Sequence, residues 1–152
     1  MFCGLKWGNE MYFDEFQYSS QGGRSYNEDS IGSKYFDDCG IFVVADGLGG
    51  HQFGKDASDC VVDTILEGWS CQEENRSEWL TGQIAAANTH ILAIQQERQS
   101  VLKSTAVALA IDGKSAVWAN VGDSRLYYLH ESGIYGCTED HSVSFKKYKA
   151  GE

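Results

Sequence analysis

The spacing of hydrophobic residues changes twice along the chain, and this change constrains the fold more than any other feature. Residues 11–20, 31–36 and 40–45 are short runs rich in aromatic or β-branched side chains, which indicates strands. Between residues 57 and 94 the apolar positions recur every three or four residues, which indicates two amphipathic helices. From residue 105 the strand-like spacing returns. We therefore expect an α+β domain in which helices cover a face of an antiparallel sheet.

Local signals predict where the helices begin and end. The first helix should end near Gly68, and Ser77 is the expected N-cap of the second, because a serine side chain can accept a hydrogen bond from the first turn. The second helix should end where residues 95–100 become fully polar. A last helix is expected over residues 143–151, with Gly151 as its C-cap.

The later strands are separated by turn signals. Asp112-Gly113 is a strong hairpin signal between residues 105–111 and 115–121, and a further strand is expected at residues 126–129. Three consecutive antiparallel strands, a meander, are the simplest arrangement of these segments.

Length and charge narrow the class of protein. A chain of 152 residues fits one domain. Its 12 Lys and Arg residues against 22 Asp and Glu give a net charge of −10, and no basic run is present, which argues against a nucleic acid partner. No apolar stretch approaches the roughly 18 residues of a membrane helix, and no leader-like start is seen. A cytoplasmic location without membrane contact is expected.

The five cysteines do not follow a recognisable spacing. They are odd in number, widely separated and without a C-x-x-C pair. Neither a disulfide framework nor a zinc site is therefore indicated, and buried or incidental thiols are expected.

Three acidic clusters follow strand-like segments, at residues 24–29, 46–51 and 122–125. Taken singly, each is ordinary turn chemistry on a solvated surface. Carboxylates that converge without a cation repel one another, and carboxylate oxygens are the ligands that Mg²⁺ and Mn²⁺ prefer. If the clusters converge, a divalent cation is implied.

In their order, these motifs resemble those of the bacterial metal-dependent serine/threonine protein phosphatases of type 2C (the PPM family). The family's patterns R-x-x-N-E-D, D-G-x-G-G-H, S-T-A, G-D-S-R and D-H-S stand here as Arg24 to Asp29, Asp46 to His51, Ser104 to Ala106, Gly122 to Arg125 and Asp140 to Ser142. The resemblance covers residues 16–152. It implies a four-layer αββα fold, an antiparallel β-sandwich flanked by helices, and hydrolysis of phosphoserine or phosphothreonine in proteins.

The resemblance also implies a phosphate-binding and a metal-binding set. Arg24 would hold the substrate phosphate, because its planar guanidinium matches two phosphate oxygens. The cofactor would be Mg²⁺ or Mn²⁺, in a two-metal centre when the domain is complete. The positions that would hold metal are Glu28, Asp46, Gly47 (through its carbonyl) and Asp123.

Two further residues take catalytic roles by the same resemblance. Asp29 would help to position the attacking water, and His51 would act as general acid for the departing serine or threonine oxygen. The water would attack phosphorus directly, so that no phosphoenzyme forms. A near match to a nucleotide-binding loop at residues 49–56 fails at Asp56, where that motif needs a hydroxyl.

The chain departs from the family pattern in two places. Lys103 stands where the family usually has glycine, and the two metal aspartates that the family carries downstream of D-H-S have no counterpart before Glu152. Residues 1–152 are therefore expected to form a single partial phosphatase domain, about its N-terminal two-thirds, incomplete at the C-terminus and with weak or no activity. Two alternatives stay open: a non-catalytic phosphatase-like binding or regulatory module, and a fold completed by a partner or a missing C-terminal segment.

Overall fold

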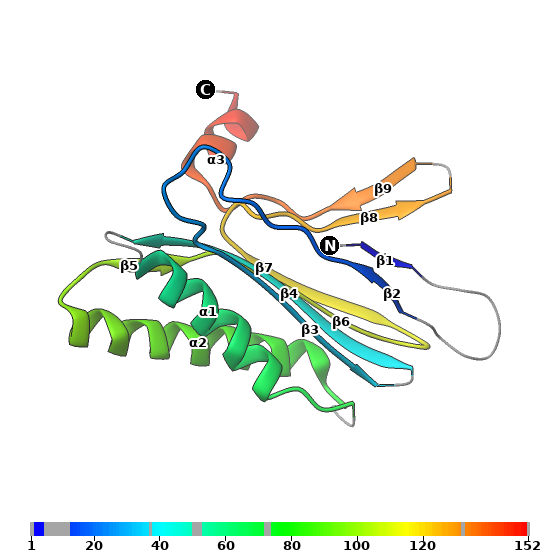
Figure 1. Ribbon diagram of the computed structural model, residues 1–152. Helices are drawn as coiled ribbons and strands as arrows, with labels where there is room; N and C mark the ends of the chain where they lie inside the picture. Colours follow the sequence, from blue (N-terminus) through cyan, green and yellow to red (C-terminus); the bar gives the residue numbers. More distant parts are fainter. Residues whose placement is uncertain are drawn as a thin grey trace.

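A computed structural model describes residues 2–4, 13–36, 38–49, 53–71, 74–131 and 133–151. Figure 1 shows two long helices against one face of a five-stranded antiparallel sheet, with two two-stranded ladders on the other side and a short helix near the C-terminus. The expected mixed fold of antiparallel sheets and covering helices is confirmed. None of the helices in these ranges is long and apolar enough to cross a membrane.

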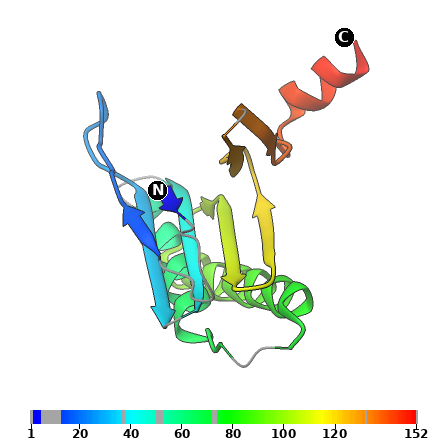
Figure 2. The same ribbon diagram turned by 90° about the vertical axis from the view of Figure 1, so that its right-hand side faces the viewer.

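The five-stranded sheet is built around its longest strand, β4. The strands that form it are β3 (Asp29–Phe36), β4 (Cys39–Gly49), β5 (Leu102–Ser104), β6 (Ala106–Asp112) and β7 (Ala116–Val121). Their order is β3-β4-β6-β7, and β5 pairs with the end of β4. Gly47 lies opposite Ser104 and Val44 opposite Val107, so β5 and β6 follow one another along the same edge of β4. Figure 2 shows the sheet turned by 90°.

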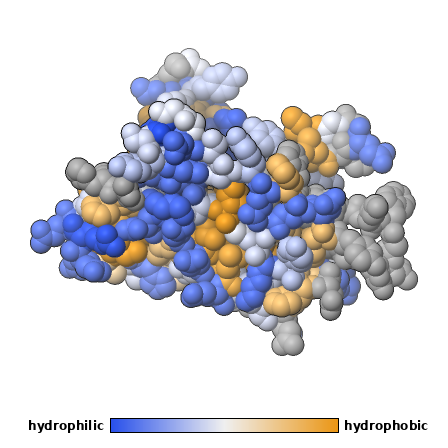
Figure 3. Space-filling model, viewed as in Figure 1, coloured by the Kyte–Doolittle hydropathy of each residue, from blue (hydrophilic) through white to orange (hydrophobic). Residues whose placement is uncertain are grey.

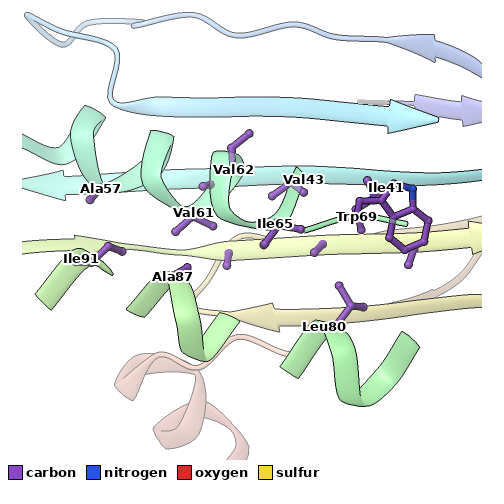
Figure 4. Packing of buried hydrophobic residues seen from close by; sticks show 14 of the residues in the cluster. Ile41, Val43, Ala57, Val61, Val62, Ile65, Trp69, Leu80, Ala87 and Ile91 are labelled. Atoms are coloured by element: carbon purple, nitrogen blue, oxygen red, sulfur yellow. The ribbon is translucent and has the colours of Figure 1, made fainter. Parts of the chain in front are cut away.

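The hydrophobic core lies between this sheet and the helices α1 (Phe53–Glu67) and α2 (Arg76–Arg98). Alternate residues of β4, such as Ile41 and Val43, contact the apolar faces of the helices (Figure 4). Ile65 of α1 is fully buried, and burial of such a side chain contributes about 1.5–3 kcal/mol. The strand residues that alternate along the sequence and the helix residues that recur every three or four positions therefore pack into one core.

Two predicted C-terminal helix ends are confirmed, and one predicted N-cap is wrong. The first helix ends next to Gly68, and the last helix, α3 (Val143–Ala150), ends at Gly151 in the left-handed conformation (φ 77°), both as expected. The expected N-cap Ser77 is wrong: the cap of α2 is Asn75, whose side chain accepts a hydrogen bond from the backbone N–H of Glu78. Asn and Ser are equally good caps, so composition alone did not separate them.

Two strand predictions need correction. In the described part of the strand expected over residues 11–20, which is 13–20, only β2 (Asp14–Phe16) is a strand, and it pairs with β1 (Phe2–Gly4). The meander includes only β6 and β7, because β8 (Tyr127–His130) pairs with β9 (Gly133–Cys137) and not with β7. Local turn signals could not predict which neighbour a strand would choose.

The cysteine prediction is also wrong for two residues. Cys39 and Cys71 form a disulfide, with Cα atoms 5.9 Å apart. The bond joins the first residue of β4 to the connection between α1 and α2. The two cysteines are 32 residues apart in the sequence, and they meet because α1 runs back along β4. Among the described cysteines, Cys60 and Cys137 are free thiols, as expected.

Candidate active site

Two of the predicted site residues face one another across β3 and β4. Asp29, the first residue of β3, is directly opposite Asp46 of β4 in the antiparallel register. Side chains of directly opposed residues lie on the same face of a sheet, with Cβ atoms about 5 Å apart, and like charges at such positions are destabilising. The strand pairing therefore brings together two carboxylates that gain from a cation between them.

The segment at Asp46 is a strand, not the turn that its Asp-Gly sequence indicated. Strand β4 continues to Gly49 because β5 pairs with its last three residues. The backbone N–H of Asp46 donates to Thr105 Oγ1 (2.9 Å), and the N–H of Thr105 donates to the Asp46 carbonyl (2.9 Å). Thr105 Oγ1 lies 2.7 Å from Ser124 Oγ. The S-T-A and G-D-S-R motifs thus hold the backbone of Asp46 in place.

Glu28 is held against the start of α1. Its Oε1 accepts a hydrogen bond from the N–H of Gly54 (3.1 Å), and its carbonyl accepts one from the N–H of Gly47 (3.1 Å). A Cβ at Gly47 would lie 1.9 Å from the Gly54 carbonyl oxygen, so no other residue fits between β4 and α1. Ser58 of α1 also donates to the Glu28 carbonyl. Nothing in the sequence pointed to Ser58, because its contact depends on helix packing.

Predicted site residues from separate segments of the chain line one hollow of about 460 Å³. Its lining includes the predicted positions Arg24, Glu28, Asp29, Asp46, Gly47 and Asp123. Thr105, Ser20 and Lys103 also line it, although sequence reasoning assigned them no role. In Figure 3, hydrophilic residues cover much of the end of the molecule at which β5 lies. His51 lies outside the described residues, so its role stays a prediction.

The acidic residues influence one another electrostatically. Burial raises the pKa of the Asp46 carboxyl above its ordinary value, and the negative charges of Asp29 and Asp123 raise it further. The positive charge of Arg24 lowers the pKa of Asp46 and so opposes this shift, while Glu28 adds to it. Carboxylates whose charges raise a neighbour's pKa in this way form a site that favours a cation or a proton.

The donor set fits a hard divalent cation. Carboxylates and a carbonyl oxygen around one hollow are the ligands that Mg²⁺ and Mn²⁺ prefer. Within the described ranges, however, no three His, Cys, Asp or Glu side chains lie close enough together to hold one ion. Mg²⁺ commonly binds through one or two carboxylates and keeps several waters, which agrees with this looser arrangement.

A second contact positions the loop that carries Asp123. Arg125 donates two hydrogen bonds to the carboxylate of Asp140, at 2.6 and 2.7 Å. The N–H of His141 donates to the carbonyl of Gly122 (2.8 Å), a glycine with φ +98° that has no room for a side chain beside Thr105. Arg125 of the G-D-S-R motif and Asp140 of the D-H-S motif are 15 residues apart in the sequence, and these hydrogen bonds join the two motifs.

Comparison with known proteins supports the motif-based resemblance. The family model described as protein phosphatase 2C matches residues 17–148. The serine/threonine phosphatase stp of Listeria welshimeri is 33% identical over 137 residues, which cover 85% of this chain and 54% of that protein. The protein phosphatase PhpP of Streptococcus pneumoniae is 29% identical over 136 residues. The chain spans about half the length of these curated relatives.

Solved structures agree with the fold. The serine/threonine phosphatase Stp1 from Staphylococcus aureus superposes with a TM-score of 0.78 at 32% identity, over 88% of this chain and 56% of that one. The catalytic domain of the phosphatase PstP, solved with two manganese ions, has a TM-score of 0.70 at 24% identity, over 84% of this chain and 55% of that one. The second likeness concerns the fold alone.

Proposed function

Because this chain belongs to the protein phosphatase 2C family, we propose that it acts on phosphoserine and phosphothreonine in proteins by metal-dependent hydrolysis. The observation that carries the proposal is the direct opposition of Asp29 and Asp46 across β3 and β4, in a hollow that also contains Arg24. The two carboxylates can bind a cation, and the neighbouring guanidinium can bind a phosphate that contacts this cation. The Listeria and Staphylococcus aureus relatives that are named as serine/threonine phosphatases support the same substrate class.

We assign the residues of this chain the following roles. Arg24 binds the phosphate oxygens of the substrate. Asp29 accepts a hydrogen bond from the attacking water and orients it. Bound Mg²⁺ or Mn²⁺ would supply a water acidic enough to lose a proton near neutral pH. The groups that would hold the metal are Glu28, Asp46, Asp123 and the Gly47 carbonyl. His51 would donate a proton to the departing oxygen.

The backbone contacts support these roles by limiting movement. Thr105 bonds to both the N–H and the carbonyl of Asp46, and Gly54 donates to Glu28. Side chains carried by paired strands and a helix end are held more rigidly than side chains on free loops. A small displacement of a catalytic group can reduce the rate about 100-fold, so this support matters for catalysis.

The test is phosphate release from a phosphothreonine peptide by the 152-residue chain, with Mn²⁺ and with EDTA. Hydrolysis by residues 1–152, which is expected to be weak, should require the metal, and Asp46→Asn, which keeps the shape and removes the charge, should reduce it by about 100-fold. Asp63→Asn is the matched control, because Asp63 is exposed on α1 and outside the hollow. Hydrolysis that persists in EDTA or in Asp46→Asn would refute the proposal.

One observation favours a second candidate, a module that binds phosphoproteins without turnover. In the part of the chain that the structure describes, no three acidic, His or Cys side chains can share one ion. Under this alternative, a fluorescent phosphopeptide binds in the presence of Mn²⁺ and depends on Arg24, but no phosphate is released. Measuring binding and release on the same sample separates the two functions.

A further inference from the structure

The described lining of the hollow includes two cationic side chains, Arg24 and Lys103. Arg24 has the role proposed above, whereas Lys103 has none. Its ammonium has no hydrogen bond or ion pair with any described residue, in contrast to Lys55, which pairs with Asp59, and Lys149, which pairs with Glu139. A lysine at a binding hollow without an internal partner is available to a ligand.

Strand geometry shows which way Lys103 points. Leu102 is 1% exposed and belongs to the core between sheet and helices, so its neighbour Lys103 projects from the opposite face of β5. The register pairs Lys103 with Leu48 of β4, which is 63% exposed. Asp46 precedes Leu48 by two residues and therefore shares its face. Lys103 and Leu48 thus lie next to Asp46 on one surface.

The position of Lys103 differs from that of Arg24. Arg24 is close enough to the acidic residues to lower the pKa of Asp46. Lys103 is farther along β5, diagonal to Asp46, at a Cα separation of about 7–8 Å for such neighbours. Lys103 lines the same hollow as Arg24, but its charge is not among those that shift the pKa of Asp46.

We propose that Lys103, together with Leu48, is a specificity-determining pair that binds an anionic side chain next to the phosphorylated residue of the substrate. The inference rests on the function proposed above. The ammonium of Lys103 pairs with the carboxylate or second phosphate of that side chain, and the exposed Leu48 contacts its methylene groups. The chain carries a net charge of −10, so it repels acidic peptides in general, and a free ammonium provides local attraction.

The experiment measures binding of fluorescent peptides to the full 152-residue chain in Mn²⁺, by anisotropy. Phosphonate groups, which this chemistry does not hydrolyse, replace every phosphate of the peptides, so that binding is measured without turnover. Three peptides differ only at the residue beside the phosphothreonine, which is Gln, Glu or phosphoserine. The wild type should bind the Glu peptide about three- to fivefold more tightly than the Gln peptide, which is the upper part of the range for an exposed ion pair. The phosphoserine peptide reports whether a second phosphate is preferred to a carboxylate.

The variants test the residue itself. Lys103→Gln should remove the preference for Glu, Lys103→Arg should retain it, and Lys103→Glu should reverse it. Lys114→Gln makes the same change of charge at an exposed lysine in the turn between β6 and β7, and should leave the preference intact. Because the pair is exposed to solvent, the preference should also weaken as salt is added.

The outcomes separate this inference from the proposed function. If the peptides bind and Arg24→Ala abolishes binding, but Lys103→Gln keeps the wild-type preference, the role of Lys103 is refuted and the function stands. Equal binding of the Gln and Glu peptides by the wild type refutes it as well. If no peptide binds in an Arg24-dependent way, the proposed function fails, and the inference about Lys103 fails with it.

Discussion

Replacing Asp29 by Asn should stabilise the chain when no metal is bound. Asp29 and Asp46 are directly opposed in the β3–β4 register, and the charge of Asp29 raises the pKa of Asp46. Asn has nearly the same shape as Asp but carries no charge. The substitution therefore removes a repulsion from the folded state while leaving the packing and the strand pairing as they are.

The magnitude follows from the spacing of the two groups. Unit charges about 5 Å apart repel by about 1 kcal/mol in a water-like dielectric and by about 3 kcal/mol at the dielectric of a protein surface. The Asp46 side chain is only partly buried and remains largely exposed to solvent, so the lower figure applies. For a chain of this size, about 1 kcal/mol corresponds to a rise of about 2–4 °C in the melting temperature.

Thermal unfolding in EDTA and in Mn²⁺ measures both parts of the argument. In EDTA, Asp29→Asn should melt above the wild type, whereas the control Asp63→Asn should not. In Mn²⁺ the wild type should gain stability, because a ligand that binds only the folded state stabilises it, and Asp29→Asn should gain less. An equal Mn²⁺ effect in both proteins, or a lower melting temperature of the variant in EDTA, would show that the two carboxylates do not act as one site.

Three other outcomes follow from the structure. Cys71→Ser should lower the free energy of unfolding by about 3–4 kcal/mol in urea titrations without reductant, because the Cys39–Cys71 bond closes a long loop. Cys60→Ser, at a free thiol, should have little effect. Dithiothreitol should remove the difference between Cys71→Ser and the wild type. Burial raises the pKa of Asp112, but hydrogen bonds from the N–H groups of Lys114 and Ser115 and from Arg76 outweigh it and leave the pKa lowered. The folded protein should therefore keep this stabilisation above the ordinary Asp pKa of about 4 and lose it as the pH falls further, and Asp112→Asn should flatten the acid side of a stability–pH curve. Gly47→Ala should destabilise the chain by at least about 1–3 kcal/mol, because its Cβ would lie 1.9 Å from the Gly54 carbonyl oxygen. Gly82→Ala, at an open position in α2, should instead raise the free energy of unfolding by about 0.5–1 kcal/mol. Thermal melts followed by circular dichroism should show the opposite signs of the two effects.

The sequence by itself determined the elements whose signals are local. The three- and four-residue spacing of apolar residues predicted α1 and α2, because each helix must present one face to the core. Asp112-Gly113 predicted the β6–β7 hairpin, and Gly151 predicted the end of α3, because these residues suit specific backbone conformations. The order of the acidic motifs also sufficed to predict the family and, among the described residues, the carboxylates that line one hollow.

Tertiary structure decided every feature that depends on contacts between distant segments. Whether Asp46 lies in a turn or a strand depends on its pairing with Asp29 of β3. The pairing of β4 with β5 sets the direction of Lys103. The disulfide between Cys39 and Cys71 depends on how α1 packs along β4. The facing of Asp29 and Asp46 is a property of strand register: a shift of one residue would turn either side chain to the other face of the sheet. Local sequence propensities do not determine that register, because it depends on the packing of the whole sheet against its helices.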